Sequence, residues 1–150
     1  MGQKVHPYGF RVGYIYDWKS RWFANRQDFP KLLLEDVKIR KFIKKALSTA
    51  AVSKIEVERT SEKIKVLIYT ARPGIIIGRR GAEIEKLKED IRKITTKDVL
   101  IEIKDIKNPN IDAQLVSENI SFQLEKRIPH KRAMKKAVQA ALDSGAQGVK

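Results

Sequence analysis

One stretch of the chain, residues 72–81, decides the fold, and it reads RPGIIIGRRG. Two glycines, Gly78 and Gly81, enclose two arginines, Arg79 and Arg80. Because glycine has no side chain, a sugar-phosphate backbone can approach such a loop closely, and the arginines supply positive charge. A helix starting after the loop would also offer unpaired amides and a partial positive charge to a phosphate. GxxG alone is a weak signal, since it also occurs in ordinary turns, so its interpretation depends on the neighbouring elements.

Hydrophobic periodicity predicts those neighbours. Before the GxxG we expect a helix over 31–48, two short strands over 55–59 and 64–68 joined by a polar connection at 60–63, and a short apolar helix over 75–77. After the loop, apolar residues at steps of three and four predict an amphipathic helix over 84–94, followed by a third strand over 99–103.

The order helix, strand, strand, helix, GxxG loop, helix, strand resembles the type II KH (K-homology) domain. In that domain the GxxG loop clamps about four nucleotides of single-stranded nucleic acid. The resemblance implies an α+β fold over residues 28–107, with the order α-β-β-α-α-β. It also implies a three-stranded sheet that carries its helices on one face.

The first 27 residues predict an irregular arm. Pro7 and the early glycines disfavour a long helix, and most of the chain's aromatic residues lie here, interleaved with basic ones. Aromatic rings stack on RNA bases while Lys and Arg neutralise phosphates, so we expect the arm to contact RNA. The alternative is that these rings pack against the body of the domain.

Residues 107–110, which read KNPN, interrupt the pattern and predict a domain boundary. Residues 108–150 then carry two amphipathic helices, at 113–124 and 131–143, which we interpret as the incomplete helical start of a second α/β domain.

The second of these helices has a one-sided basic face. Lys131 and Lys135, and likewise Arg132 and Lys136, are four residues apart, and no acidic residue lies between 126 and 143. Because like charges repel, we expect an anionic partner here. A solvated face that keeps the protein soluble is the alternative. Membrane binding is disfavoured, because the opposite face is mostly alanine.

Composition excludes several functions. The chain has 150 residues, a formal net charge of +14, no cysteine and two histidines. Disulfide scaffolds, thiolate zinc sites and cysteine nucleophiles are thus excluded, and no apolar run approaches the roughly 20 residues of a membrane span. There is no P-loop, GxSxG elbow or histidine pair at metal-ligand spacing, so we expect no enzyme, catalytic residue, metal, cofactor or small-molecule substrate. The acidic residues of 83–90 interleave with lysines as on a solvated helix face, although a metal-dependent nuclease stays open for them.

Three segments carry a closer resemblance that spans the chain. Residues 2–13 read GQKVHPYGFRVG, the loop is at 72–81, and residues 131–137 read KRAMKKA after a Lys-Arg pair at 126–127. Together they resemble the bacterial-type small-subunit ribosomal protein S three family. Members of this family continue for several tens of residues with strands that pair over the two carboxy-terminal helices, so we expect the second domain of this chain to be incomplete.

The family resemblance implies a place in the head of the small ribosomal subunit, in the cytoplasm. Ribosomal RNA would lie under the KH domain and the arm, whose matching positions are Gln3, Lys4, His6, Arg11, Lys19 and Arg21. It implies that Lys131, Arg132 and Lys135 line the opening through which mRNA enters, and that neighbouring head proteins are S ten and S fourteen. A free-standing KH-domain regulator or RNA chaperone is the rival hypothesis, which composition does not separate from the first.

Overall fold

The computed structural model describes residues 2–149, and within them every side chain except that of Arg80. In chain order the elements are α1 (Pro7–Arg11), β1 (Ser20–Arg21), α2 (Phe29–Ala46), the 3-10 turn η1 (Ser48–Ala50), β2 (Val52–Arg59), β3 (Lys63–Thr70), α3 (Pro73–Ile77), the 3-10 turn η2 (Arg79–Gly81), α4 (Ala82–Arg92), β4 (Asp98–Asp105), α5 (Ala113–Glu125) and α6 (His130–Asp143). From α2 to β4, this order is the one predicted for a KH domain, and each element ends within three residues of its expected position.

The sheet has four strands in the order β1-β2-β3-β4, rather than the predicted three. β2 and β3 form the expected antiparallel hairpin, and β4 joins β3 in parallel. The additional strand, β1, comes from the arm and pairs in parallel with β2, where the amide of Val57 donates to the carbonyl of Lys19 at 2.9 Å. Two residues are too few to show an alternating pattern in the sequence. In the structure they pair with Val57 and Glu58, and so cover the C-terminal end of the β2 edge, which would otherwise be unpaired.

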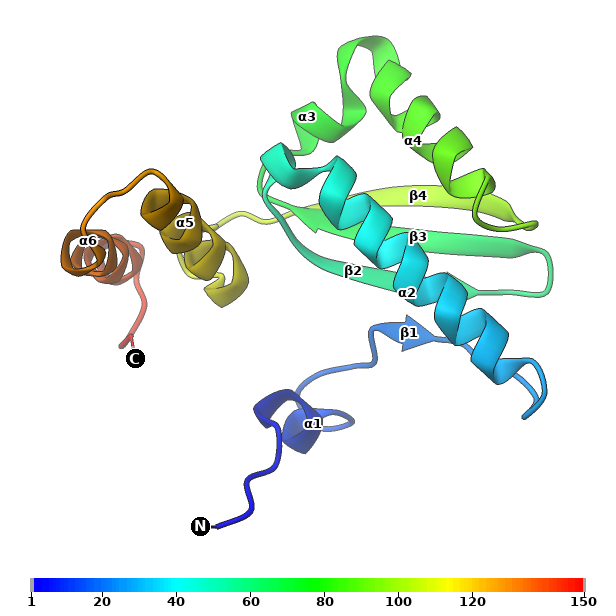
Figure 1. Ribbon diagram of the computed structural model, residues 1–150, viewed down its shortest axis with the longest axis horizontal. Helices are drawn as coiled ribbons and strands as arrows, with labels where there is room; N and C mark the ends of the chain where they lie inside the picture. The colour runs from blue at the N-terminus through cyan, green and yellow to red at the C-terminus, as the bar shows by residue number, and fades with distance from the viewer. Residues whose placement is uncertain (1, 150) are drawn as a thin grey trace.

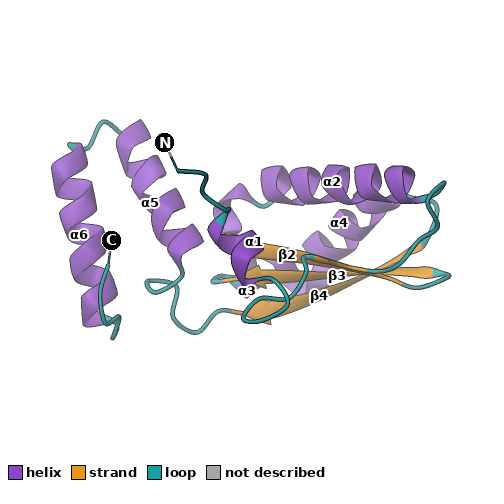
Figure 2. Ribbon diagram, turned by 90° about the horizontal axis from the view of Figure 1, so that it is seen from below, coloured by secondary structure: helices purple, strands orange, loops and turns teal. Residues whose placement is uncertain are grey.

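The core lies between one face of the sheet and helices α2 and α4 (Figure 2). Both helices are amphipathic, and the alternate residues of each strand point to the same side. The core side chains with the least exposure are aliphatic: Ile39, Ile43, Val57, Ile64, Val66, Ile68, Ile76, Ile91 and Val99. No helix among residues 2–149 packs on the sheet's other face (Figure 2).

A buried carboxylate, Asp36 of α2, ties the arm to the domain. Its side chain is 0% exposed, and its Oδ1 accepts hydrogen bonds from Nε and Nη2 of Arg59 at 2.8 and 2.6 Å. Its Oδ2 accepts from Ser20 Oγ and Trp22 Nε1, both at 2.7 Å. The Arg59 side chain is only 3% exposed and also meets Glu35 at 2.9 Å. Because both oxygens are satisfied and the charge is paired, the carboxylate can lie in the interior.

The last two helices, α5 and α6, pack against each other beside the KH domain (Figures 1 and 2). Two contacts hold α5 in place. Asp112 caps α5 through the amide of Leu115 and accepts a hydrogen bond from Ser53 Oγ at 2.7 Å, while Lys44 of α2 meets Glu118 at 2.7 Å. Both helices agree with the sequence prediction, whereas the division into segments 1–27, 28–107 and 108–150 stays a prediction. Within residues 2–149, no helix combines the length and the apolar character that crossing a bilayer requires.

Candidate nucleic-acid interface

The GxxG loop is shaped by two glycines in conformations that other residues rarely adopt. α3 ends where the amide of Gly78 donates to the carbonyl of Gly74 at 3.0 Å, and Gly78 has φ +68° and ψ −172°. A Cβ at Gly78 would lie 2.5 Å from Cγ of Glu83, so this position has no room for a side chain. Gly81 has φ +81° and leads directly into α4. The sequence placed these glycines correctly between two helices, and the structure adds the steric reason for Gly78.

The loop projects from the domain between α3 and α4 (Figure 1). Arg79 is exposed and takes part in none of the ion pairs among the described residues, while the side chain of Arg80 lies outside them. Next to the loop, Ile75 and Ile77 are 44% and 43% exposed, although Ile76 between them is buried. The loop is therefore a cationic turn with an apolar margin. Sequence reasoning treated the three isoleucines alike, but successive residues of a helix point about 100° apart, so the three cannot all face the core.

The first turn of α4 carries acidic residues, which limits what the loop can attract. Glu83 and Glu85 lie there, where the partial positive charge of the helix favours carboxylates as it favours phosphates. An anion at the loop would thus be held mainly by the arginines and by the backbone that the glycines leave open.

The arm is more ordered than the sequence predicted, because its aromatic residues pack on one another. The rings of Tyr8 and Tyr16 stack with centroids 5.2 Å apart and 3° between their planes. The ammonium of Lys19 lies 5.0 Å from the centroid of Tyr8, and the Tyr8 hydroxyl donates to the carbonyl of Asp17 at 2.7 Å. His6 caps the short helix α1 by accepting from the amide of Tyr8 through Nδ1.

Other arm residues stay open to solvent. Gln3 and Lys4 are exposed, and the Arg11 guanidinium donates to the carbonyl of Pro7 at 2.9 Å. Trp22 packs on Phe29, with ring centroids 5.4 Å apart, as the packing alternative proposed. Four other rings are largely exposed: Phe10 at 73%, Tyr14 at 92%, Trp18 at 63% and Phe23 at 93%. The arm thus divides into rings that hold its shape and rings that are free to stack on a partner.

Arg21 differs from the other predicted arm contacts, because its guanidinium, although exposed, is paired with carboxylates of the protein itself. It lies 2.6 Å from Glu56, 3.1 Å from Glu58 and 3.2 Å from Asp17. Burial by itself raises the pKa of Glu56, but its ion pairs with Lys54 and Arg21 outweigh burial and lower that pKa. The charge of Arg21 therefore neutralises carboxylates and fastens the arm to β2.

The open face of the sheet is a network of paired charges. Glu102 lies between Lys65 at 2.6 Å and Lys104 at 2.7 Å, and their hydrogen bonds lower the pKa of Glu102 to about 2. Lys54 is paired with Glu56 and its ammonium lies 5.5 Å from the ring centroid of Tyr69. Because these cations already have carboxylate partners, this face offers little free charge to a polyanion.

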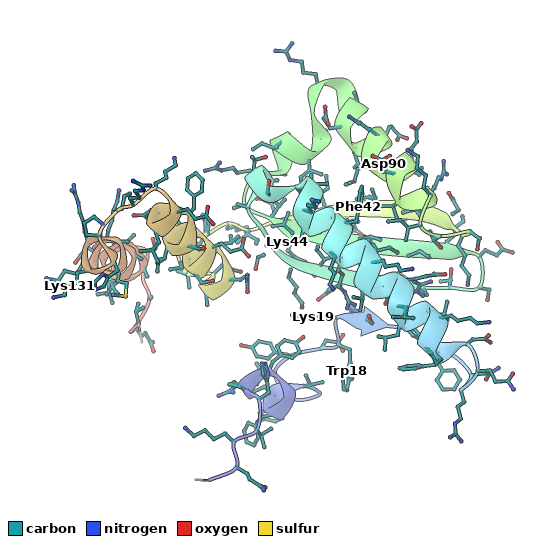
Figure 3. All side chains as sticks on the ribbon, viewed as in Figure 1. Trp18, Lys19, Phe42, Lys44, Asp90 and Lys131 are labelled. Atoms are coloured by element: carbon teal, nitrogen blue, oxygen red, sulfur yellow. The ribbon has the colours of Figure 1, made fainter. Side chains whose placement is uncertain are left out.

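The basic face of α6 has the opposite character. A surface hollow of about 660 Å³ is lined by Lys131, Arg132, Lys135, Lys136 and Gln139. Among the described residues, none of the four cations takes part in an ion pair. Figure 3 shows Lys131 on the side of α6 away from the KH domain. The structure thus brings together the predicted residues Lys131, Arg132 and Lys135.

The turn that leads into α6 is strained. Arg127 follows α5 with φ +60°, and its amide donates to the carbonyl of Leu124 at 2.8 Å. Nearby, the Lys126 ammonium lies 4.1 Å from the ring centroid of Phe122. A helix end of this shape usually has glycine at the left-handed position. An arginine there adds a further cation beside the basic face.

Among residues 2–149, no group of three or more His, Asp or Glu side chains is placed to hold a metal ion. The acidic residues of α4 are instead used locally, as in the ion pair of Asp90 with Lys93 at 2.6 Å.

Comparison with known proteins agrees with this geometry. The family model of the KH domain matches residues 38–111. The small ribosomal subunit protein uS3 of Caldicellulosiruptor saccharolyticus is 58% identical over 151 residues, covering 100% of this chain and 68% of that protein. The proteins of the same name from Koribacter versatilis and Geobacter metallireducens are 57% and 53% identical over 150 residues, and the chain covers 67% and 71% of their lengths. The chain contains a KH domain and belongs to the small ribosomal subunit protein uS3 family.

Proposed function

We propose that the protein is a non-catalytic, RNA-binding component of the small ribosomal subunit in the cytoplasm, and that it holds ribosomal RNA through its KH loop and its arm. The observation that carries the proposal is the GxxG loop, exposed between α3 and α4 in a chain that belongs to the uS3 family. In KH domains this loop clamps the backbone of about four nucleotides.

At the loop, we expect the RNA backbone to lie against the main chain of the glycines, where a larger side chain would obstruct its approach. Gly78 allows the turn to form against Glu83, where a Cβ would clash, and Arg79 is free of carboxylate partners among the described residues. The exposed Ile75 and Ile77 offer apolar surface to riboses and bases. Among the described side chains of the loop, none is held by the protein in a position to read a base edge, so we expect RNA binding there to show little sequence preference.

In the arm, charge and exposed rings act together. Lys4, Arg11 and Lys19 supply charge for phosphates, with Gln3 and His6 as polar contacts, and the exposed rings supply stacking surfaces. Arg21 would act indirectly, by holding the arm against β2 through its carboxylate partners.

For α6 we propose a contact with mRNA where the message enters the subunit. Lys131, Arg132 and Lys135 lie on one helix face without carboxylate partners among the described residues, and the hollow that they line is open to solvent. Segment 108–150 would then present the message-binding helix, segment 28–107 the KH domain and segment 1–27 the arm. Family membership also supports S ten and S fourteen as protein neighbours.

The first experiment is sucrose-gradient sedimentation of a cell lysate at low and then at high salt, with the chain followed by antibody. Migration with the small subunit at both salt concentrations supports the proposal. A chain that runs free, or leaves at modest salt, would favour a free-standing KH regulator instead.

A second experiment tests whether the GxxG loop contacts RNA phosphates. Arg79→Asp/Arg80→Asp should lower the affinity for an unstructured RNA and flatten its salt dependence, by about 0.7 logarithmic unit for each phosphate that the variant no longer neutralises. Lys63→Asp/Lys107→Asp is the matched control, since both lysines are exposed and lie outside the proposed sites. An unchanged salt slope in the loop variant would remove the loop from the interface.

For the message contact, Lys131→Glu/Arg132→Glu/Lys135→Glu should leave subunit association intact while weakening the crosslinking of mRNA to the chain. If crosslinking is unaffected, α6 does not touch the message.

A further inference from the structure

A row of lysines lies on the outer side of α2, away from the GxxG loop and α6, and its first member, Lys31, lies beside the end of the arm at Phe23. Lys31, Lys38, Lys41 and Lys45 are spaced by seven, three and four residues, which places them in one line on the helix surface. We call these four residues the α2 ridge. With a rise of about 1.5 Å per residue, the ridge is about 21 Å long.

The ridge is uncovered and unpaired. In Figures 1 and 2, α2 lies over the sheet and no other element covers its outer side. All four lysines are exposed, and within residues 2–149 none of them takes part in an ion pair. The two carboxylates of α2, Glu35 and Asp36, are both engaged by Arg59. Glu35 and Asp28 line the same hollow as Lys31, so the charge least offset by nearby acids is that of Lys38, Lys41 and Lys45.

The ridge differs from the open face of the sheet in how its positive charge is balanced. On the open face of the sheet, each of four cations forms an ion pair with a glutamate of a strand, so the domain itself balances its charge. The cations are Arg21, Lys54, Lys65 and Lys104. On the ridge the lysines repel one another, since like charges three or four residues apart destabilise a helix. Repulsion left without a counter-charge on the protein favours an anionic partner.

We propose that the α2 ridge binds the phosphate backbone of double-stranded RNA, as a contact separate from the loop. The ridge runs along the exposed surface of a helix, with the exposed Leu34 between Lys31 and Lys38, and no aromatic residue is part of it. Single strands are usually held by stacking of their bases on such rings, whereas a duplex offers regularly spaced phosphates and no free base faces. A duplex carries regularly spaced charges, about one every 3.4 Å along the axis for each strand of B-form DNA, so a ridge of about 21 Å is long enough to meet several phosphates.

This inference rests on the proposed RNA-binding function for its choice of ligand, and it adds a second kind of RNA to that function. The loop with its glycines would hold a single strand, and the ridge would rest against a helix of folded RNA. An acidic protein is the competing partner for the ridge, and the test below separates the two.

The test uses the full chain with two probes, a 20-base-pair RNA duplex and an unstructured single strand, in fluorescence anisotropy titrations at several salt concentrations. Lys38→Glu/Lys41→Glu should reduce the duplex salt slope by about 2, because each phosphate that is no longer neutralised lowers the slope by about 0.9. Its single-strand slope should equal that of the unmodified chain. Lys63→Glu/Lys107→Glu makes the same change in net charge at exposed positions off the ridge and should leave the duplex slope close to that of the unmodified chain.

Lys38→Gln/Lys41→Gln removes the charges without adding carboxylates, and it must change the duplex slope in the same direction. Thermal unfolding of each variant confirms that it is folded. Equal duplex slopes for the ridge variant and its control would overturn the inference, and so would an unmodified chain that binds only the single strand. The latter result leaves the proposed function standing, whereas binding of neither probe refutes both.

Discussion

Replacing the buried carboxylate Asp36 by asparagine should destabilise the protein more than any other isosteric substitution in the KH domain. Asp36 accepts hydrogen bonds through both oxygens, from Arg59 on one side and from Ser20 and Trp22 on the other. Asparagine has the same shape but presents an NH₂ group on one of these two sides. Whichever way the amide turns, it places a donor against Arg59 or against the indole N–H of Trp22.

The magnitude follows from the burial of the pair. Removing one partner of a buried ion pair costs about 3–5 kcal/mol, because the other charge stays buried without compensation. Here Arg59 is 3% exposed but retains Glu35 at 2.9 Å, so we expect the lower end of that range, about 3 kcal/mol. For a chain of this size, that corresponds to a fall in melting temperature of about 10 °C.

The assay is urea unfolding of Asp36→Asn, with Asp105→Asn as the matched control. Asp105 is exposed, and among the described residues it takes part in no ion pair, so its substitution should change the free energy of unfolding by less than about 0.5 kcal/mol. A Trp18→Phe background leaves Trp22 as the only tryptophan, because the chain has two. In that background Asp36→Asn should shift the emission of Trp22 to longer wavelength, as the indole loses its carboxylate partner and the arm loosens.

A destabilisation of less than about 1 kcal/mol, with unchanged Trp22 emission, would refute the assignment of Asp36 as the anchor of the arm. A double variant gives an independent check. Asp36→Leu/Arg59→Met should cost less than the sum of its two single variants, because no unpaired charge is then left in the interior.

Three further predictions concern backbone and charge. Gly78→Ala should lower the free energy of unfolding by about 2 kcal/mol or more in urea, because φ +68° with ψ −172° is open essentially only to glycine and the new Cβ would lie 2.5 Å from Glu83. Gly81→Ala is its matched comparison and should cost only about 1 kcal/mol, since the nearest atom to its Cβ is 3.9 Å away. Arg127→Gly should raise the free energy of unfolding by about 0.5 kcal/mol, because relief of left-handed strain slightly exceeds the added entropy of the unfolded chain. The same substitution should weaken RNA binding at α6. The pKa of Glu102 is lowered to about 2 by its two lysine partners, so its ion pairs stabilise the fold fully above pH 4.5 and are lost as the pH falls towards 2, which an NMR titration of that carboxyl measures.

Each of these has a clear contrary result. Equal destabilisation by the two glycine variants would mean that the contact with Glu83 adds nothing to the strain. A destabilised Arg127→Gly would show that the arginine makes contacts that outweigh its backbone cost. If the measured pKa of Glu102 were near its ordinary value of 4.5, the two lysines would not form ion pairs with it in solution.

The local features of this protein could be predicted from the sequence because they depend on neighbours along the chain. The stripes of α2 and α4, the alternation of β2 to β4 and the GxxG loop are all periodic or contiguous patterns, and they led to the KH order. The same holds for the basic face of α6, since its residues repeat every four positions on a single helix. The short strand β1 and the helix α1 escaped prediction, because elements of two and five residues contain too few side chains to display a period.

What only the tertiary structure decided is which charges are used by the fold and which remain free. The sequence showed Arg21, Lys65 and the lysines of α2 as equivalent members of a basic chain. The parallel pairing of β3 with β4 brings Lys65 to Glu102, and the pairing of β1 with β2 brings Arg21 to Glu56. By contrast, the lysines on the outer side of α2 form no ion pair with a carboxylate among the described residues. Likewise, nothing in the sequence distinguishes Asp36 from other acidic residues on helices, whereas in the structure it accepts hydrogen bonds from Ser20, Trp22 and Arg59. These contacts join residues 14 to 37 positions apart, and no local pattern determines which of them will meet.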